Sequence, residues 1–203
     1  MSVAFGALVL SFSPAMASPP RASPMFHEIT TFARIQKAKL ATLNDHGVEL
    51  GESPGKGKGV FAKRALKKND FVTVYPSHAV GTQIDSERVA WQCPRAYTPE
   101  HLDEMSKHYA VAVMGGVVAG DPELHDEGLG HMVNDGARSR SPADADVYRF
   151  VSRAKENVHP YIMCTMVNDV CGSTVLMRAT RDIEKGEELL YSYGVPYWEE
   201  DYP

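Results

Sequence analysis

The sequence lacks the cysteine and histidine spacings that mark metal sites and disulfide frameworks. Its three cysteines, Cys93, Cys164 and Cys171, include no CxxC pair, and its eight histidines include no HExxH. Zinc clusters and small disulfide-bonded domains depend on such paired spacings. We therefore predict neither a bound metal nor a fold held together by disulfides.

A long hydrophobic run is also missing. The run from Val3 to Phe12 is too short to span a bilayer, so no membrane partner is predicted. It precedes Ala15-Met16-Ala17 but lacks a basic segment before it, and no acidic residue occurs before Glu28. Residues 1–20 are thus open to three interpretations: a secretory signal, an organellar presequence or a loosely packed tail. Without targeting, we expect the nucleus or cytoplasm.

An excess of positive charge is absent, which argues against direct binding to nucleic acid. The net charge is -5 over 203 residues, and the pI is about 5.9. This mildly acidic balance suits a basic peptide or protein as partner. The length fits one domain with modest insertions, and no feature indicates the oligomeric state.

The most unusual stretch is GESPGKGKGVFA, from Gly51 to Ala62. A Walker A loop requires four residues between its glycines and then Lys with Ser or Thr. Here Gly51 and Gly55 are separated by three residues, and Lys56 is followed by Gly57. The following residues predict a strand, which offers no helix N-terminus for a phosphate. A nucleotide phosphate site is therefore disfavoured, and a plain flexible turn stays open as an alternative.

The remaining pattern predicts a β-rich α+β fold. We assign residues 1–25 to a tail, 26–47 to a helix and 48–203 to the main domain, with an insert at about 79–128. Short apolar runs bounded by turn residues predict strands at 59–62, 71–75, 109–114, 117–119, 161–166, 174–179 and 188–191. Thr98-Pro99 begins one helical insert, and a second carries Val147, Phe150, Val151 and Ala154 on one face.

Two segments of the chain resemble each other. Residues 64–70 and 181–187 each lead into a strand that ends in tyrosine, at Tyr75 and Tyr191. Asn69 and Gly186 stand at the corners, where a positive φ is expected. The pattern predicts two similar turns at opposite ends of the domain, although two unrelated hairpins would give the same pattern.

Three segments of the chain stand out: GKGKGVFA at 55–62, GHMVNDG at 130–136 and GEELLYSYG at 186–194. Their order and spacing resemble the SET domain of protein lysine methyltransferases. The resemblance covers roughly Val48 to Trp198. It implies small sheets in a β-clip arrangement and a C-terminal pseudoknot. It departs from the family at Asp135, where His is usual, and at Ser77, where Gly is usual. Many relatives carry a cysteine-rich zinc module where this chain has VPYWEEDYP. The aromatic residues Tyr197, Trp198 and Tyr202 are expected to form the lid instead, and packing on the side of the domain stays open as an alternative.

The resemblance implies that S-adenosylmethionine is the cofactor. Gly57 and Gly59 would let the backbone approach the donor, because no Cβ stands in the way. The other residues assigned to donor binding are Lys56, Lys58, Asn134, Asp135, Tyr193 and Trp198. Alternatively, the side chains of Lys56 and Lys58 are simply solvated, and Asn134 is an ordinary turn residue.

The same resemblance assigns catalysis to three tyrosines. Tyr193 would position the sulfonium and the attacking nitrogen, while Tyr191 and Tyr75 would line the lysine channel. The expected reaction is methylation of a lysine ε-amine in a basic protein, and a histone tail is the most plausible substrate. The rival interpretation is a non-catalytic SET-like module that binds a peptide or partner protein.

Overall fold

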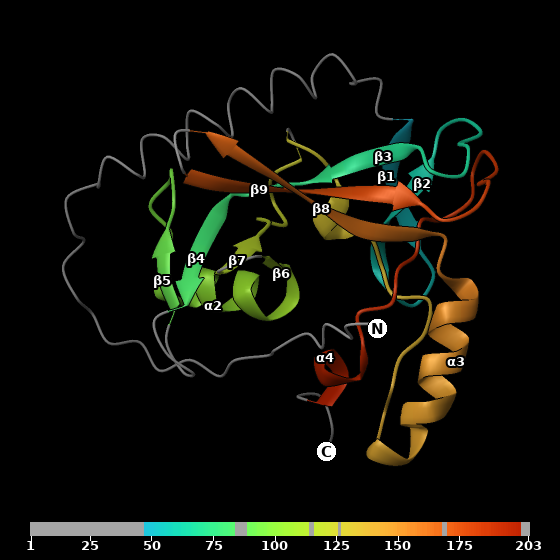
Figure 1. Ribbon diagram of the computed structural model, residues 1–203. Helices are drawn as coiled ribbons and strands as arrows, with labels where there is room; N and C mark the ends of the chain where they lie inside the picture. The colour runs from blue at the N-terminus through green and yellow to red at the C-terminus, as the bar shows by residue number, and fades with distance from the viewer. Residues whose placement is uncertain (1–46, 84–88, 114–115, 126, 168–169, 200–203) are drawn as a thin grey trace.

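Three small antiparallel sheets form the frame of the molecule (Figure 1). The computed structural model describes residues 47–83, 89–113, 116–125, 127–167 and 170–199. The first sheet pairs β1 (Val48–Ser53) with β2 (Gly57–Ala62). The second has the order β3 (Phe71–Tyr75), β9 (Val170–Ala179), β8 (Val158–Val167). The third has the order β5 (Val89–Gln92), β4 (Ala79–Gln83), β7 (Gly116–Ala119), β6 (Ala110–Val113).

Short helices join and flank these sheets: α2 (Pro99–His108), η1 (Gly130–Met132), η2 (Pro142–Asp144), α3 (Ala145–Lys155) and α4 (Val195–Glu199). α2 begins as predicted, because the Thr98 hydroxyl accepts a hydrogen bond from the His101 backbone N–H at 3.2 Å. In Figure 1, α2 lies against the four-stranded sheet, while α3 and α4 lie together on one side of the molecule. None of the helices in the described ranges has the length and apolar character needed to cross a membrane.

The predicted β-rich fold is confirmed, with corrections to single strands. β3 has the predicted bounds, and β2, β6, β7, β8 and β9 overlap the predicted runs. β1, β4 and β5 were not predicted. The strand predicted at 188–191 is wrong: this segment makes only isolated bridges, from Glu188 to Phe61 and from Leu190 to Asn134. The helix predicted at 26–47 lies outside the described residues, and the domain boundaries remain a prediction.

One hydrophobic core joins the first two sheets. Its most buried side chains are Val60, Leu66, Val133, Val158, Val175, Met177, Ile183 and Leu189. Leu189 is fully buried although it belongs to no strand. Burying a leucine side chain contributes about 1.5–3 kcal/mol, so Leu189 anchors the C-terminal segment to the core.

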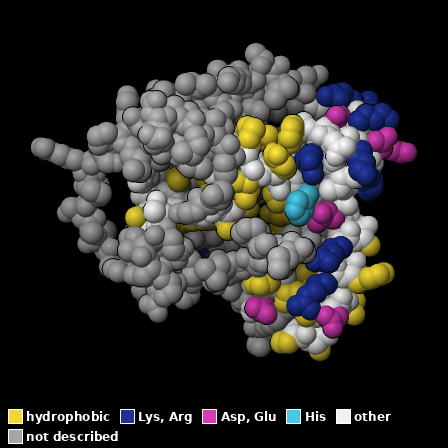
Figure 2. Space-filling model, viewed as in Figure 1, with side chains coloured by type: hydrophobic (Ala, Val, Ile, Leu, Met, Phe, Trp, Pro, Cys, Tyr) yellow, Lys and Arg dark blue, Asp and Glu magenta, His cyan; other side chains and the backbone are white. Residues whose placement is uncertain are grey.

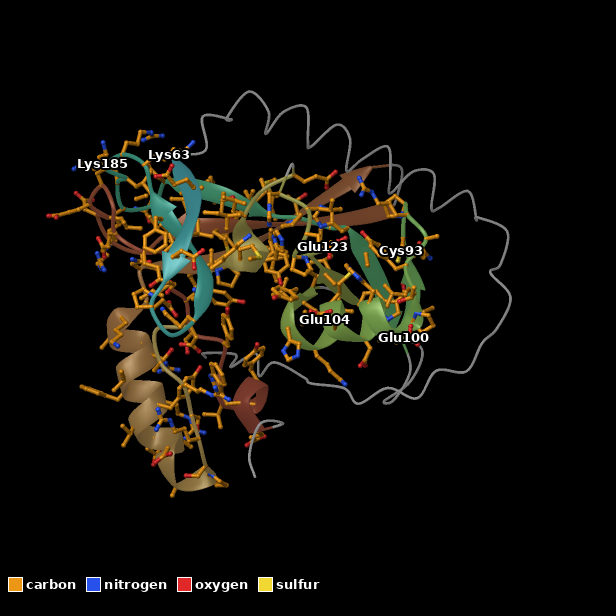
Figure 3. The ribbon with its side chains drawn as sticks, turned by 180° about the vertical axis from the view of Figure 1, so that it is seen from behind. Lys63, Cys93, Glu100, Glu104, Glu123 and Lys185 are labelled. Carbon is orange, nitrogen blue, oxygen red and sulfur yellow. The ribbon has the colours of Figure 1, made fainter. Side chains whose placement is uncertain are left out.

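The two similar segments pair with each other. Asn69 and Gly186 both have positive φ, 76° and 83°, as the sequence predicts. The backbones of Leu66 and Ile183 exchange hydrogen bonds of 2.9 and 3.0 Å in an antiparallel bridge. Lys63 and Lys185 accordingly lie at the same corner of the molecule (Figure 3). This pairing brings the chain that follows β2 beside the chain that leads into the C-terminal segment.

The C-terminal segment, residues 187–193, crosses three parts of the chain. The Leu189 N–H donates to the Val60 carbonyl at 2.7 Å, and the Tyr191 N–H donates to the Asn134 carbonyl at 3.0 Å. The Leu190 carbonyl accepts from the N–H groups of Asn157 and Val158. The segment therefore fixes β2, residues 133–135 and the start of β8 relative to one another.

The apolar stripe of α3 faces outward. Val147 and Phe150 are 65% and 77% exposed, whereas Tyr148 and Ser152 are buried. Hydrophobic side chains appear on the surface at the α3 corner of the molecule in Figure 2. An apolar stripe ordinarily faces the core. Here the polar face of the helix is buried instead, and it contacts Asp135 in the candidate site.

Candidate functional site

β2 approaches the C-terminal segment so closely that a side chain at position 59 would displace Glu188 and Asn134. A Cβ at Gly59 would lie 2.6 Å from Glu188 Oε1 and 2.7 Å from Asn134 Nδ2. Gly57, two residues earlier, has φ of 76° and open space where a side chain would project. The start of β2 is thus bare backbone, which a ligand can contact directly.

Asn134 and Glu188 connect this backbone to the rest of the site. Asn134 Nδ2 donates to the Lys58 carbonyl at 3.0 Å and to Glu188 Oε1 at 2.9 Å. Lys56 Nζ lies 3.0 Å from Glu188 Oε2 and 3.4 Å from the Asp135 carbonyl. Burial raises the pKa of Glu188, but hydrogen bonds from Asn134 and Lys56, with the charge of Lys56, hold it below its usual value. Glu188 is therefore ionised and pairs with Lys56.

The sequence assignment missed Glu188. The signal available was its position one residue before the buried Leu189, which puts its side chain on the opposite face, toward β2. The side chain of Lys58, by contrast, is exposed, and only the Lys58 carbonyl takes part in this network.

Ser53 lies in a short sequence that matches a motif of hydrolases. Residues 51–55 spell GESPG, which fits the GxSxG pattern of a hydrolase nucleophile elbow. That motif requires a turn from a strand into a helix, with the serine exposed. Ser53 is instead buried at the end of β1, in a hairpin that leads into β2. Its hydroxyl lies beside Glu188 and serves no nucleophile elbow.

Asp135 lies at the centre of a buried polar cluster. The side chain, only 4% exposed, accepts hydrogen bonds on both carboxylate oxygens. Oδ1 accepts from the Ala137 N–H at 3.0 Å and from the Ser152 hydroxyl at 2.5 Å. Oδ2 accepts from the Tyr148 hydroxyl at 2.5 Å, the Tyr193 N–H at 3.0 Å and the Trp198 indole N–H at 3.3 Å. These groups explain why the polar face of α3 is the buried one.

Aromatic rings from the C-terminal segment and α4 gather around Tyr193. The ring centroids of Tyr191 and Tyr197 lie 4.8 and 4.6 Å from that of Tyr193. The Trp198 ring is nearly parallel to that of Tyr193, at 11° and 6.1 Å. The Tyr193 hydroxyl donates to the Val133 carbonyl at 2.7 Å. Tyr193 is therefore held at its hydroxyl by residue 133 and at its backbone by Asp135.

Tyr75 lies on the core side of this cluster. It is 3% exposed, and Tyr191 packs against the same core. Burial raises the pKa values of Tyr75, Tyr191 and Tyr193 well above the ordinary value, and neighbouring tyrosines reinforce the shift. All three hydroxyls therefore keep their protons at neutral pH, so none of them acts as a base.

Two further tyrosines belong to this region and were not predicted. Tyr109 follows α2, and its ring lies 6.3 Å from that of His131, which is equally close to Tyr75. Tyr148 lies on α3 and donates to Asp135. Neither residue stands in a segment that carries the family resemblance. Tyr109 offered no sequence signal, and Tyr148 offered only its place between the apolar positions of α3.

The described residues contain no group of three or more His, Cys, Asp or Glu side chains placed to hold a metal ion. Cys93, labelled in Figure 3 beside the four-stranded sheet, lies far from the labelled lysines of the β2 corner. Burial raises its pKa to about 11, so its thiol stays protonated at neutral pH.

Comparisons with known proteins identify a family and similar chains. The family model described as SET domain matches residues 57–194. N-lysine methyltransferase KMT5A-A of Danio rerio is 25% identical over 167 residues, covering 78% of this chain and 40% of that protein. The chain thus spans less than half of this curated relative.

Two solved structures are similar to the chain. CpSET8 from Cryptosporidium has a TM-score of 0.46 and 20% identity, covering 81% of this chain and 65% of that one. A Plasmodium falciparum protein described as a putative histone methyltransferase has a TM-score of 0.39 and 19% identity, covering 75% and 97%.

Proposed function

Because the chain belongs to the SET domain family, we propose that it transfers a methyl group from S-adenosylmethionine to a lysine ε-amine of a protein. The observation that carries the proposal is the convergence of three segments. The C-terminal segment 187–193 hydrogen-bonds to both β2 and residues 133–135, so the glycine backbone, Asn134 and the tyrosine cluster lie in one place. The zebrafish relative, by its name, acts on lysine nitrogen.

The residues around Gly57 and Gly59 fit the methyl donor. The bare backbone at the start of β2 allows close main-chain contact, and Gly57 has open space beside it. When bound, the donor supplies an activated methyl group on a positively charged sulfur. We assign its binding to Lys56, Gly57, Lys58, Gly59, Asn134, the backbone of Asp135, Tyr193 and Trp198. Trp198 offers a ring for stacking on adenine, a contact typically worth about 1–3 kcal/mol.

The Lys56–Glu188 pair refines this assignment. Both side chains are partly exposed, at 34% and 17%. A cation and an anion side by side complement the carboxylate and the amino group that the donor carries. Because the Lys56 charge already has a partner in Glu188, donor binding at this point would exchange one ion pair for another.

The lysine substrate must react as a neutral amine. With an unperturbed pKa of roughly 10.4, only about one lysine in a thousand is neutral near pH 7.4. A cluster of protonated tyrosines excludes water and adds no negative charge, and such surroundings favour the neutral amine. Much of the rate enhancement then comes from alignment of the amine with the methyl group.

Tyr193 is suited to this alignment. A hydroxyl has one donor and two acceptor lone pairs, and the donor of Tyr193 is used by the Val133 carbonyl. Its oxygen therefore directs lone pairs away from Val133, where they can attract positive charge. We assign Tyr191 and Tyr75 to the walls of the lysine channel, since Tyr191 contacts Tyr193 and Tyr75 is buried behind it.

We propose a histone tail as the most plausible substrate, which implies action in the nucleus. A histone tail is basic and extended, whereas this chain has a net charge of -5. An extended basic peptide can add to an exposed sheet edge beside the channel.

The test is incubation with labelled methyl donor, core histones and lysate proteins. We expect label on a lysine of a basic protein, and incorporation slowed about a hundredfold or more with Tyr193→Phe. A folded protein that binds neither donor nor product, yet retains histone peptides, would support the rival proposal of a non-catalytic binding module. In that module, Asp135 and Ser77 would mark the departure from the catalytic pattern.

A further inference from the structure

We propose that Asp135 is a positioning residue: its buried carboxylate fastens α3 to the C-terminal segment and so holds Tyr193 and Trp198 in place. The inference rests on the proposed function for its consequence in catalysis. The arrangement itself can be tested without any turnover.

The donors around Asp135 come from three separate parts of the chain. Ser152 and Tyr148 belong to α3, whereas Tyr193 and Trp198 belong to the C-terminal segment and α4. The fifth donor, the Ala137 N–H, belongs to the loop that follows Asp135. α3 and the C-terminal segment thus meet on one carboxylate.

Two further contacts tighten this cluster. The Gly194 N–H donates to the Tyr148 hydroxyl at 2.9 Å, and the Tyr148 ring lies 6.4 Å from that of Trp198. The guanidinium of Arg138 lies 5.4 Å from the Trp198 ring centre. Burial and the hydrogen bond to Asp135 raise the pKa of Tyr148, so its hydroxyl remains a donor.

A carboxylate comes closest to satisfying this set of five donors. Its two oxygens offer about four lone-pair sites, and the Trp198 indole N–H, at 3.3 Å, makes the longest of the five hydrogen bonds. Asparagine would turn an NH₂ group toward groups that also donate, and neutral histidine offers a single acceptor. The aspartate that stands where the family usually has histidine is therefore matched to Tyr148 and Ser152 of α3. The aspartate at position 135 and the buried polar face of α3 therefore depend on each other.

Asp135 and Val133 together fix both ends of Tyr193. The carboxylate of Asp135 holds the Tyr193 backbone, and the Val133 carbonyl holds the hydroxyl. Loss of the carboxylate would release the backbone and the Trp198 indole while the hydroxyl contact remains. Displacing a reacting group by about 1 Å can lower a rate by about a hundredfold.

Trp198 fluorescence gives a direct measure of the arrangement. The chain has two tryptophans, and Trp91→Phe leaves Trp198 as the only one. In that background we compare Asp135→Asn with Asp146→Asn. Asp146 lies on α3, and its side chain is 94% exposed. We expect Asp135→Asn to move the Trp198 emission to longer wavelength and to lower kcat by roughly tenfold to a hundredfold, with a smaller rise in KM for the donor. Asp146→Asn should change neither.

Tyr148→Phe and Ser152→Ala provide a second route if Asp135→Asn does not fold. Each removes one donor from the carboxylate and should shift the Trp198 emission in the same direction by a smaller amount. Unchanged emission in folded Asp135→Asn, or in both α3 variants, overturns the proposal. So does a fall in kcat without a change in emission. If the wild-type protein transfers no methyl group, the proposed function fails, and the emission comparison still decides the role of Asp135.

Discussion

Tyr191 and Tyr193 are in contact, yet their surroundings differ. The Tyr193 hydroxyl donates to the Val133 carbonyl, while Tyr191 is anchored through its backbone N–H to Asn134. Two residues so close in sequence can thus have separate roles in methyl transfer.

We expect Tyr193→Phe to keep the fold and donor affinity while lowering turnover about a hundredfold or more, as loss of one preorganised group commonly does. Tyr191→Phe should keep activity and move products toward higher methylation, because more room is left for a methylated amine. The wild type should then make chiefly mono- or dimethyl-lysine. Mass spectrometry of the product checks both expectations. Equal losses of activity with an unchanged product distribution would reduce both tyrosines to structural residues.

The buried side chain of His131 should make the stability of the fold depend on pH. The side chain is 4% exposed and contacts the Asp121 carbonyl through Nε2. Burial, together with neighbouring His78 and His125, lowers its pKa from 6.5 to about 4. The unfolded chain therefore binds a proton that the folded chain excludes between these two values. Stability is complete above about pH 6.5 and is lost as the pH falls toward 4, by roughly 3 kcal/mol at most.

Urea unfolding at several pH values between 7.5 and 4.5 measures this loss. His131→Asn should flatten the pH dependence, whereas His159→Gln, a change at an exposed histidine on β8, should leave most of it. An unchanged slope in His131→Asn would assign the acid sensitivity to other groups.

At the scale of the element, two glycines at the turn into β2 make a matched pair. Gly55 and Gly57 have φ of 75° and 76°, and at neither residue would an added Cβ have another atom within 4 Å. Only Gly57 lies in the proposed donor site. Donor at about 100 times its Kd should stabilise the wild type by about 2.7 kcal/mol.

Gly57→Val should abolish this stabilisation, since its side chain occupies the space proposed for the donor. Gly55→Val should retain it despite the same backbone strain. Thermal unfolding with and without the donor, or its demethylated product, makes the comparison. An equal loss in both variants would point to strain in the hairpin rather than to a donor site.

The outward face of α3 gives a prediction that contradicts its sequence pattern. Phe150→Ser at a buried position would cost about 3–5 kcal/mol, as large core truncations do. Because Phe150 is 77% exposed, we expect a change within about 0.5 kcal/mol in denaturant unfolding. Ser152→Val on the buried face should cost more, since it leaves Asp135 short of a donor. A large loss for Phe150→Ser would place the apolar stripe in an interface.

Turn chemistry and motif spacing made much of the fold predictable. Asn69, Gly186 and the Thr98 cap obey local rules, which the structure confirms. The orientation of α3 was not predictable, because it depends on a carboxylate contributed by residue 135. The alternation with Leu189 indicated which way the Glu188 side chain points, but its pairing with β2 was not predictable, since periodicity within one segment carries no information about a distant partner.

At the scale of the whole molecule, the segments that form the site are far apart in the sequence. Lys56 and Glu188 are separated by 132 positions, and Asn134 and Lys58 by 76. The hairpins β1–β2 and β8–β9, by contrast, pair residues close in sequence. Local pairs close early during folding, whereas distant contacts require a large loss of chain entropy first.

The crossing of residues 187–193 over β2 and Asn134 therefore has a kinetic consequence. In the Trp91→Phe background, we expect stopped-flow refolding to show β-sheet circular dichroism before Trp198 fluorescence reaches its native value. Simultaneous recovery of the two signals would contradict this order. A chain that has regained its hairpins but not this crossing would then lack the proposed site for a methyl donor. Such partly folded molecules would be inactive, and would not methylate other proteins at random.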